Sequence, residues 1–224
     1  MIDPAQDAFG VALLDYCEGR HVPELMLEVK GGSSGPAMHP EWFFRSFECW
    51  DWWERELLPL VRCGPVLDLG AGAGRAALYF QQRGLLPVTA VDASPGAVEV
   101  CRRRGIADVR LGNANNPPRD RSWAAVLLLC GNLGLGGSWE GNRRLLTQLA
   151  ERVTPGTVLV GDSVTPAGSP QVDLRIRYKD LITPWWPQYN IPAERMAALV
   201  DGTGWTISRH LQDGEDHAVL LRRT

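Results

Sequence analysis

Val66-Leu-Asp-Leu-Gly-Ala-Gly-Ala-Gly74 is the stretch on which the fold of this chain depends. Its first four residues are apolar except for Asp68, and a short apolar run that ends at glycine predicts a buried strand. Alternating glycines follow, and residues 75–83 then have helical composition up to Gly84. A sharp turn that lets a ligand approach the backbone leaves no room for a Cβ, so the stretch predicts a strand, a glycine turn and a helix. An ordinary tight turn has the same pattern, and the surrounding sequence has to decide between the two.

Beyond this stretch, apolar runs alternate with amphipathic segments up to residue 162. Further strands are expected at residues 86–92, 107–111, 123–130 and 157–162. Helices are expected at residues 94–105, with Ser94 as the cap, and 142–153. This alternation predicts an α/β fold, a Rossmann-like, mostly parallel sheet with helices on both faces. A pair of strands at 205–211 and 217–222 closes the sheet and brings it to seven strands.

Two segments outside this pattern are expected to cover the sheet. Residues 1–60 contain apolar pieces with helical spacing at 8–16 and 23–29, and they predict an N-terminal helical cap or lid on a core of residues 61–224. The glycine- and serine-rich stretch 31–36 is interpreted as its hinge or lid loop. The aromatic residues between 42 and 53 either fill a groove on the main domain or line an acceptor pocket, and both can hold.

The second covering segment is an insertion at about residues 165–192. Within it, residues 171–178 alternate apolar and polar side chains as a half-exposed strand does. Residues 184–190 follow as an aromatic, proline-rich loop, and residues 192–200 as a helix that ends at Gly202.

Composition limits the class of protein. The chain has 224 residues, a formal net charge of -3, 45% hydrophobic and 22% charged residues, which is typical of a soluble globular protein. The net charge argues against a nucleic-acid-binding protein, and Arg102–Arg104 point in different directions on a helix, as solvated residues do. The five cysteines show no CxxC spacing and no metal pattern, which favours reduced thiols in a cytoplasmic setting. No apolar run is long enough for a transmembrane helix.

Two acids occupy matching places near the ends of predicted strands, Asp68 in the first and Asp92 in the second. Ligands of open parallel sheets bind outside the carboxyl ends of the strands. An acid about 20 residues beyond a glycine turn is placed to accept hydrogen bonds from ribose hydroxyls, so the turn and Asp92 together predict a nucleoside-bearing ligand. The spacing Gly-x-Gly-x-Gly differs from the Gly-x-Gly-x-x-Gly of dinucleotide folds, which argues against a nicotinamide oxidoreductase.

In these residues the sequence resembles the class I S-adenosylmethionine-dependent methyltransferases. The glycine motif of that family is matched by residues 66–75, its Val-Asp-x-Ser-Pro pattern is matched by residues 91–95, and the resemblance extends over about 60–224. It implies a methyltransferase with S-adenosylmethionine as its cofactor. The glycine loop, anchored by Asp68, would lie against the methionine part, Asp92 would bind the ribose, and Ala93 would lie against the adenine. The implied cofactor-binding residues are Asp68, Gly70, Ala71, Gly72, Gly74, Asp92, Ala93, Asn113, Ala114 and Cys130.

The chain departs from the family pattern at three places. These are the turn after the third predicted strand, the start of the fourth strand and the loop that follows the fourth strand. Gly112-Asn-Ala114 stands where the family commonly has Gly-Asp-Ala; the side-chain oxygen of Asn113 can still accept from an adenine amino group, or it only caps a turn. Ser122-Trp-Ala124 replaces the frequent Phe-Asp. The loop Cys130–Gly134, where the family holds the sulfonium end, lacks an Asn/Asp-Pro-Pro-Tyr sequence, which argues against methylation of amides or adenine amino groups.

The sequence determines the methyl acceptor less well than the methyl donor. A hydroxyl or carbon acid usually needs a general base, and His39, between the hinge and the aromatic segment, is the candidate catalytic base; otherwise it is an exposed loop histidine. His210 and His217, in the terminal strands, are expected at the surface. Candidate substrate-binding residues are Tyr16, Trp42, Arg175, Tyr178, Trp186 and Tyr189.

We therefore expect an enzyme that methylates a small molecule, of the kind found in specialised metabolism. It is expected to act as a monomer or homodimer, with no nucleic-acid or membrane partner. One alternative keeps the activity and changes the acceptor to a peptide or protein group, which an open groove would favour. Another is a catalytically inactive cofactor-binding partner protein, which tight cofactor binding without turnover would favour.

Overall fold

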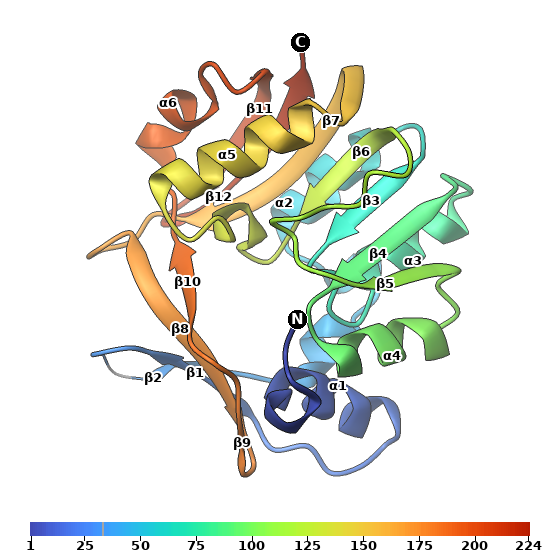
Figure 1. Cartoon of the computed structure of the whole chain (residues 1–224), viewed down its shortest axis with the longest axis vertical. Coiled ribbons are helices and arrows are strands. Elements are labelled where there is room, and N and C mark those ends of the chain that lie inside the picture. The colour runs from blue at the N-terminus through green and yellow to red at the C-terminus, as the bar shows by residue number, and fades with distance from the viewer. Residues whose placement is uncertain (33) are drawn as a thin grey trace.

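The computed structural model describes residues 1–32 and 34–224, and its centre is a seven-stranded sheet in the order β11-β12-β7-β6-β3-β4-β5 (Figure 1). Strands β3 to β7 run parallel, and β12 and β11 are antiparallel to their neighbours. The chain leaves β3 toward β4 and β5 on one side, and returns to the other side with β6 and β7. The strands are β3 (Val66–Leu69), β4 (Val88–Asp92), β5 (Asp108–Leu111), β6 (Trp123–Leu128), β7 (Val153–Val164), β11 (Trp205–Asp213) and β12 (Asp216–Arg223).

Helices cover both faces of this sheet, as the alternation predicts. One face packs against α2 (Trp52–Leu57), α3 (Arg75–Gln82) and α4 (Pro95–Arg103), and the other against α5 (Trp139–Ala150) and α6 (Met196–Val200). Side chains along a strand alternate between the two faces of the sheet. Val66 therefore packs in the hydrophobic cluster under α2 and α3, while Leu67 and Leu69 pack in the cluster under α5 and α6. Ser94 caps α4 with a hydrogen bond from the Ala97 amide at 3.0 Å. The Rossmann-like fold is confirmed.

A second, smaller antiparallel sheet combines both covering segments. Its order is β10-β8-β1-β2, and β9 pairs with β8. Figure 1 shows it beside the carboxyl ends of the central strands, with the N-terminal helix α1 (Ala8–Cys17) packed between it and α4. The strands are β1 (Leu25–Val29), β2 (Ser34–Met38), β8 (Gln171–Tyr178), β9 (Leu181–Ile182) and β10 (Trp186–Tyr189).

This second sheet corrects three expectations. Residues 23–29 were expected to be helical, but Leu25–Val29 is a strand whose Met26 pairs with Arg177. Of the stretch 31–36, expected to be a hinge or lid loop, residues 34–36 belong to strand β2, and residue 33 lies outside the described residues. Residues 186–189 are a strand and not a loop. A mostly apolar run of five residues fits a helix or a strand equally well. Pairing with the distant strand β8 decided between them.

The aromatic segment is broken into short turns and is not one helix. It contains the 3-10 helices Pro40–Phe43, Phe47–Cys49 and Leu58–Leu60 around the six-residue α2. Phe47 stacks on Tyr79 of α3 with ring centroids 4.6 Å apart, and Trp50 and Trp53 are buried in the core below α3. These aromatic side chains therefore fill a groove on the main domain. The cap is helical at α1 and α2 and contains a β-hairpin between them.

The C-terminal region follows the prediction in outline. The helix expected at residues 192–200 is a 3-10 turn, Ala193–Arg195, followed by α6. His217 was expected at the surface, but it is 1% exposed, and its Nε2 lies 2.7 Å from the Ile191 carbonyl oxygen. The segment that carries Ile191 covers its ring, and the His210 ring lies 5.2 Å away between centroids. Among the described residues, no helix is long and apolar enough to cross a membrane.

Candidate active site

The glycine turn lies at the carboxyl end of β3, and each of its glycines has a left-handed backbone. The φ angles of Gly70, Gly72 and Gly74 are 77°, 57° and 75°. A Cβ on Gly70 would lie 2.3 Å from the Asn132 side-chain nitrogen, and one on Gly74 would lie 2.2 Å from Ile106 Cδ1. Both positions therefore exclude a side chain for conformational and for steric reasons. The turn is built for close backbone approach, as the spacing predicts.

Asp92 ends β4 and is attached directly to the glycine turn. The Gly72 amide donates to Asp92 Oδ2 at 2.8 Å, and the Ser94 amide donates to Oδ1 at 2.9 Å. Each carboxylate oxygen accepts one bond and keeps a lone pair for another donor. Burial raises the pKa of Asp92 to about 6, although the two amide donors oppose this. Asp92 therefore joins the two strand ends between which a nucleoside would lie.

Asp68 lies in β3, two residues before Gly70, and is 2% exposed. Its Oδ2 atom is buried and has no hydrogen-bond partner among the residues that the structure describes. Burial raises the pKa of Asp68 to about 7; the nearby Arg75 opposes this and Asp92 adds to it. A buried carboxylate oxygen without a donor is costly, and a cationic or hydrogen-bond-donating ligand would compensate for it.

The loop after β6 closes the site on the other side of β3. The Asn132 side-chain amide donates to the carbonyl oxygens of Leu69 and Gly70 at 3.0 and 3.1 Å. The Gly131 amide donates to Asp162 Oδ2 at 2.8 Å, and the Gly131 carbonyl accepts from Gln188 of β10 at 2.7 Å. This loop therefore connects β3, β7 and the second sheet.

Asn132, Asp162 and Gln188 were not identified from the sequence. Asp162 could have been found, because it sits near the carboxyl end of its strand as Asp68 and Asp92 do. Its Oδ1 is buried and has no partner among the described residues, and burial raises the pKa of this carboxyl to about 7. Nothing in the local sequence marks Gln188, since its role depends on the register of β10.

A buried ion pair underlies the loop. Two nitrogens of Arg75, the first residue of α3, donate to the two carboxylate oxygens of Glu54 at 2.9 and 2.6 Å. Glu54 is fully buried, and the Arg75 guanidinium lies 4.5 Å from the ring centroid of Trp50. Arg75 also donates to Cys130 Sγ at 3.4 Å. Cys130 has a φ of 61°, an uncommon conformation for a residue with a Cβ. The aromatic segment thus reaches the expected sulfonium end of the site.

On the expected adenine side, the N-terminus adds contacts that the sequence did not reveal. The Ile2 amide donates to the Ala93 carbonyl oxygen at 2.9 Å. Asp7 Oδ2 accepts from Ser94 Oγ and from the Gly96 amide, both at 2.8 Å, and this holds α1 against the start of α4. Asn113 Oδ1 accepts from the Asn115 amide at 2.8 Å, which is the turn-capping alternative. Its exposed amide leaves room for a further contact.

The N-terminal candidates form a separate group. His39 caps a 3-10 helix by accepting from the Glu41 amide at 3.2 Å, and its ring lies 6.0 Å from that of Tyr16 in an edge-to-face arrangement. Tyr16 also packs on Phe44. Trp42 is 43% exposed. His39 remains a prediction as a base, and its ring nitrogen already has a structural role.

The four candidates from the insertion are mostly engaged within the protein. Arg175 Nε donates to Glu28 at 2.6 Å, and its guanidinium lies 4.4 Å from the Trp185 ring centroid. The Tyr178 hydroxyl donates to the buried Asp15 at 2.8 Å. The side chain of Tyr189 is 5% exposed and belongs to the core below α5, and Trp186 packs on the cluster between α1 and the second sheet.

Comparison with known proteins agrees with this geometry. A family model described as a methyltransferase domain matches residues 66–156, and no curated protein matches the chain. A solved S-adenosylmethionine-dependent methyltransferase from Bacteroides fragilis, in complex with S-adenosyl-L-homocysteine, is 24% identical, with 100% of this chain and 98% of that chain covered and a TM-score of 0.86.

Two less similar structures are named for their acceptors. CalS10 from Micromonospora echinaspora, an amino pentose methyltransferase involved in calicheamicin biosynthesis, is 14% identical, covers 78% of this chain and 92% of its own, and has a TM-score of 0.57. The sugar N-methyltransferase KedS8 from Streptoalloteichus sp. is 17% identical, with 77% and 86% covered and the same TM-score of 0.57.

The matched domain begins at Val66, where the decisive stretch begins, and it contains the glycine turn, Asp92 and the loop after β6. The glycine turn and Asp92 lie side by side at the carboxyl ends of β3 and β4, as the motifs require. Residues 66–156 thus match a methyltransferase domain, and the whole chain shares the fold of a solved S-adenosylmethionine-dependent methyltransferase.

Proposed function

We propose that this enzyme transfers the methyl group of S-adenosylmethionine to an amine-bearing small molecule held between the central sheet and the second sheet. The observation that carries the proposal is the hydrogen bond of Gln188 to Gly131, because it fixes the second sheet against the loop after β6. This attachment supports an acceptor enclosed between the two sheets over one bound in an open groove.

The residues at the glycine turn fit the cofactor. Gly70 and Gly72 give close backbone access, Asp92 keeps lone pairs for ribose hydroxyls, and the unpartnered Asp68 Oδ2 suits the positive charge of the methionine part. When bound, the cofactor supplies a methyl group on a sulfonium whose leaving group is a neutral thioether. The contribution of the protein is then to position the acceptor and to exclude water.

An amine acceptor is favoured by Asp162. Asp162 lies near the carboxyl end of β7, and its Oδ2 accepts from Gly131, next to Cys130. An amine attacks a methyl group only in its neutral form, so an ammonium acceptor must first lose a proton. The Asp162 carboxyl is suited to take that proton, because its Oδ1 has no partner among the described residues and its pKa is about 7. The named acceptors of CalS10 and KedS8, an amino sugar and a sugar nitrogen, support the same class and a place in specialised metabolism.

The proposal also covers the cellular compartment of the enzyme and the alternative acceptors. We propose a cytoplasmic enzyme, which the five free thiols support. His39 remains the candidate base for an oxygen or carbon acceptor, and a peptide acceptor remains the alternative to a small molecule.

The cofactor assignment is tested by calorimetry. Asp92→Ala should weaken S-adenosylmethionine binding by at least roughly 10- to 100-fold, because even one hydrogen bond to a charged group contributes about 1.5–3 kcal/mol. Asp201→Ala, at an exposed aspartate beyond α6, should bind as the wild type does. Equal affinities in both variants would exclude Asp92 from the ribose site.

The acceptor class is tested by methyl transfer to amino sugars, to their hydroxyl counterparts and to short peptides. Turnover confined to amines, and lost in Asp162→Asn while cofactor affinity stays normal, is expected. Turnover of hydroxyl compounds that depends on His39 would contradict the amine assignment.

A further inference from the structure

A pocket of about 660 Å³ lies at the end of the sheet opposite the glycine turn. It is formed where β6 and β7 begin, beside the C-terminal end of α5. Its polar lining residues are Arg119, Arg121, Ser122, Gln148, Glu151, Arg152 and Thr154. None of them belongs to the methyl-transfer site.

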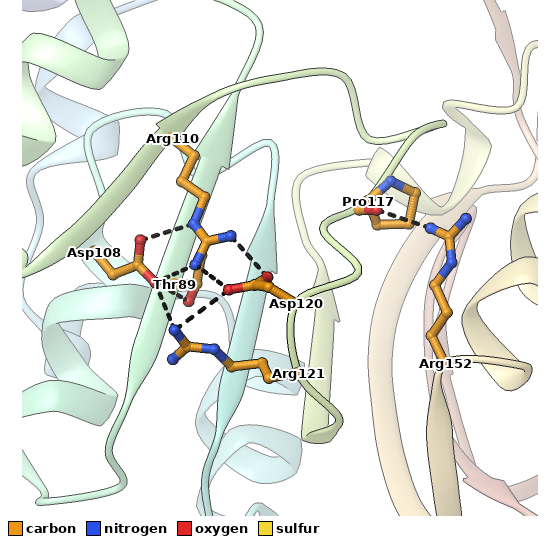
Figure 2. A network of polar contacts seen from close by, with 7 residues as sticks. All are labelled: Thr89, Asp108, Arg110, Pro117, Asp120, Arg121 and Arg152. Carbon is orange, nitrogen blue, oxygen red and sulfur yellow. Dashed lines mark hydrogen bonds and ion pairs between the residues drawn. The ribbon is translucent and has the colours of Figure 1, made fainter.

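The arginines of this pocket differ in their partners. Arg121 lies 3.6 Å from Asp108 and 3.5 Å from Asp120, within a network in which Arg110 also binds both acids (Figure 2). Arg152 makes one hydrogen bond, to the Pro117 carbonyl oxygen at 2.9 Å, and no ion pair among the described residues. Arg119 makes neither within the part of the chain that the structure describes.

Two guanidinium groups therefore share the pocket without a bound acid. The Arg152 side chain is half-buried; its pKa is lowered by burial and next by the positive charge of Arg119. Glu151 also lines the pocket, but it is exposed and binds neither arginine. The hydroxyl groups of Ser122 and Thr154 have no partner among the described residues and add two further donors. An anion bound between these groups would offset the electrostatic repulsion between the two arginines. It would also accept hydrogen bonds from donors that have no acceptor among the described residues.

We propose that this pocket binds the phosphate group of a small molecule that is neither the cofactor nor the methyl acceptor. Phosphate fits better than carboxylate, because two guanidinium groups and two hydroxyls offer more donors than two carboxylate oxygens take up, and because a phosphate carries close to two negative charges.

The pocket is physically connected to the cofactor side by one loop. Residues 112–122 run from Asn113, beside the expected adenine site, to Arg119 and Ser122 at the pocket. Arg152 holds this loop in the middle, at Pro117. A phosphate that draws the Arg152 guanidinium inward acts on the same loop, so occupation of the pocket shifts the affinity for S-adenosylmethionine.

The test is calorimetric titration of the whole protein with inorganic phosphate and pyrophosphate, at constant ionic strength set with chloride. Saturable binding is expected, and Arg119→Ala and Arg152→Ala should each weaken it about tenfold, since each removes a charged donor. Citrate should bind more weakly than pyrophosphate. Arg144→Ala, at an exposed arginine of α5 outside the pocket, is the matched control and should leave binding unchanged.

Arg119 is exposed and makes no hydrogen bond or ion pair among the described residues, so its removal should leave the fold intact even if Arg152→Ala does not. Saturating S-adenosylmethionine should not compete with pyrophosphate, although it can change its affinity. Direct competition, equal binding by Arg119→Ala and wild type, or loss of all binding in chloride would each overturn the proposal. None of these outcomes depends on methyl transfer, so the pocket is tested independently of the proposed acceptor.

Discussion

At the scale of single residues, the site is defined by buried carboxylates with too few partners. Asp68 and Asp162 each keep one buried oxygen without a donor among the described residues, and burial raises the pKa of both carboxyls to about 7. Evolution retains such groups where they act on a ligand, because a hydrophobic residue would fold more stably there. These two acids are therefore expected to reduce the stability of the free enzyme.

Asp162→Asn should be more stable than the wild type at pH 8 and equally stable near pH 4. The native carboxyl has a pKa of about 7 against an ordinary value of 3.8, so the folded state binds the proton more tightly. The free energy of unfolding of the wild type thus falls as pH rises from about 4 to 7, by up to about 4 kcal/mol for a three-unit difference, and the loss is complete above that range. Asparagine keeps the bond from Gly131 and does not ionise.

Urea denaturation of both proteins between pH 4 and 8 measures this difference. The two curves should separate only as the pH rises. A constant difference at every pH would mean that the substitution acts through packing and not through ionisation.

At the scale of elements, side-chain hydrogen bonds add to the apolar packing that joins the second sheet to α1 and to the core. Gln188 of β10 binds the Gly131 carbonyl, and Asp15 of α1 binds Tyr178 and Lys179 at the tip of β8. Under the proposed function, the strands between these points face the methyl acceptor. Their attachment is then expected to determine how firmly the acceptor is enclosed.

Gln188→Ala should raise the KM for the acceptor several-fold while cofactor affinity stays near that of the wild type, because β10 loses its bond to the loop after β6. Steady-state kinetics with calorimetry measure both quantities. Gln171→Ala, at an exposed residue of β8, is the control. A fall in cofactor affinity alone would show that Gln188 supports the glycine turn instead.

At the scale of the whole molecule, a buried ion pair and aromatic packing join the aromatic segment to the central core. Glu54 is 0% exposed and binds Arg75 through both carboxylate oxygens. A buried pair adds little net stability, but removal of one partner leaves the other charge buried and unpaired.

Glu54→Gln should lower the free energy of unfolding by about 3 kcal/mol, and the double variant Glu54→Gln with Arg75→Gln should recover part of that loss. Chemical denaturation measures both, and a double-mutant cycle gives the coupling between them. If the two losses simply add, the pair does not connect the segments energetically.

The sequence by itself determined the central sheet and the methyl donor. Val66–Gly74 carries its structure locally, since glycines with left-handed φ and a flanking apolar strand need no distant partner to be recognised. Asp92 follows at a fixed chain distance, so its place beside the turn could also be predicted. These features depend on short-range backbone geometry, which residues close together in the sequence determine.

Only the tertiary structure decided what covers this core. Leu25–Val29 is a strand because Gln171–Tyr178 pairs with it from the far end of the chain, and His217 is buried because the segment around Ile191 packs against its ring. Asn132, Asp162 and Gln188 meet at the loop after β6 from separate elements. Such contacts depend on register and on packing between segments far apart in sequence, and no local pattern specifies them.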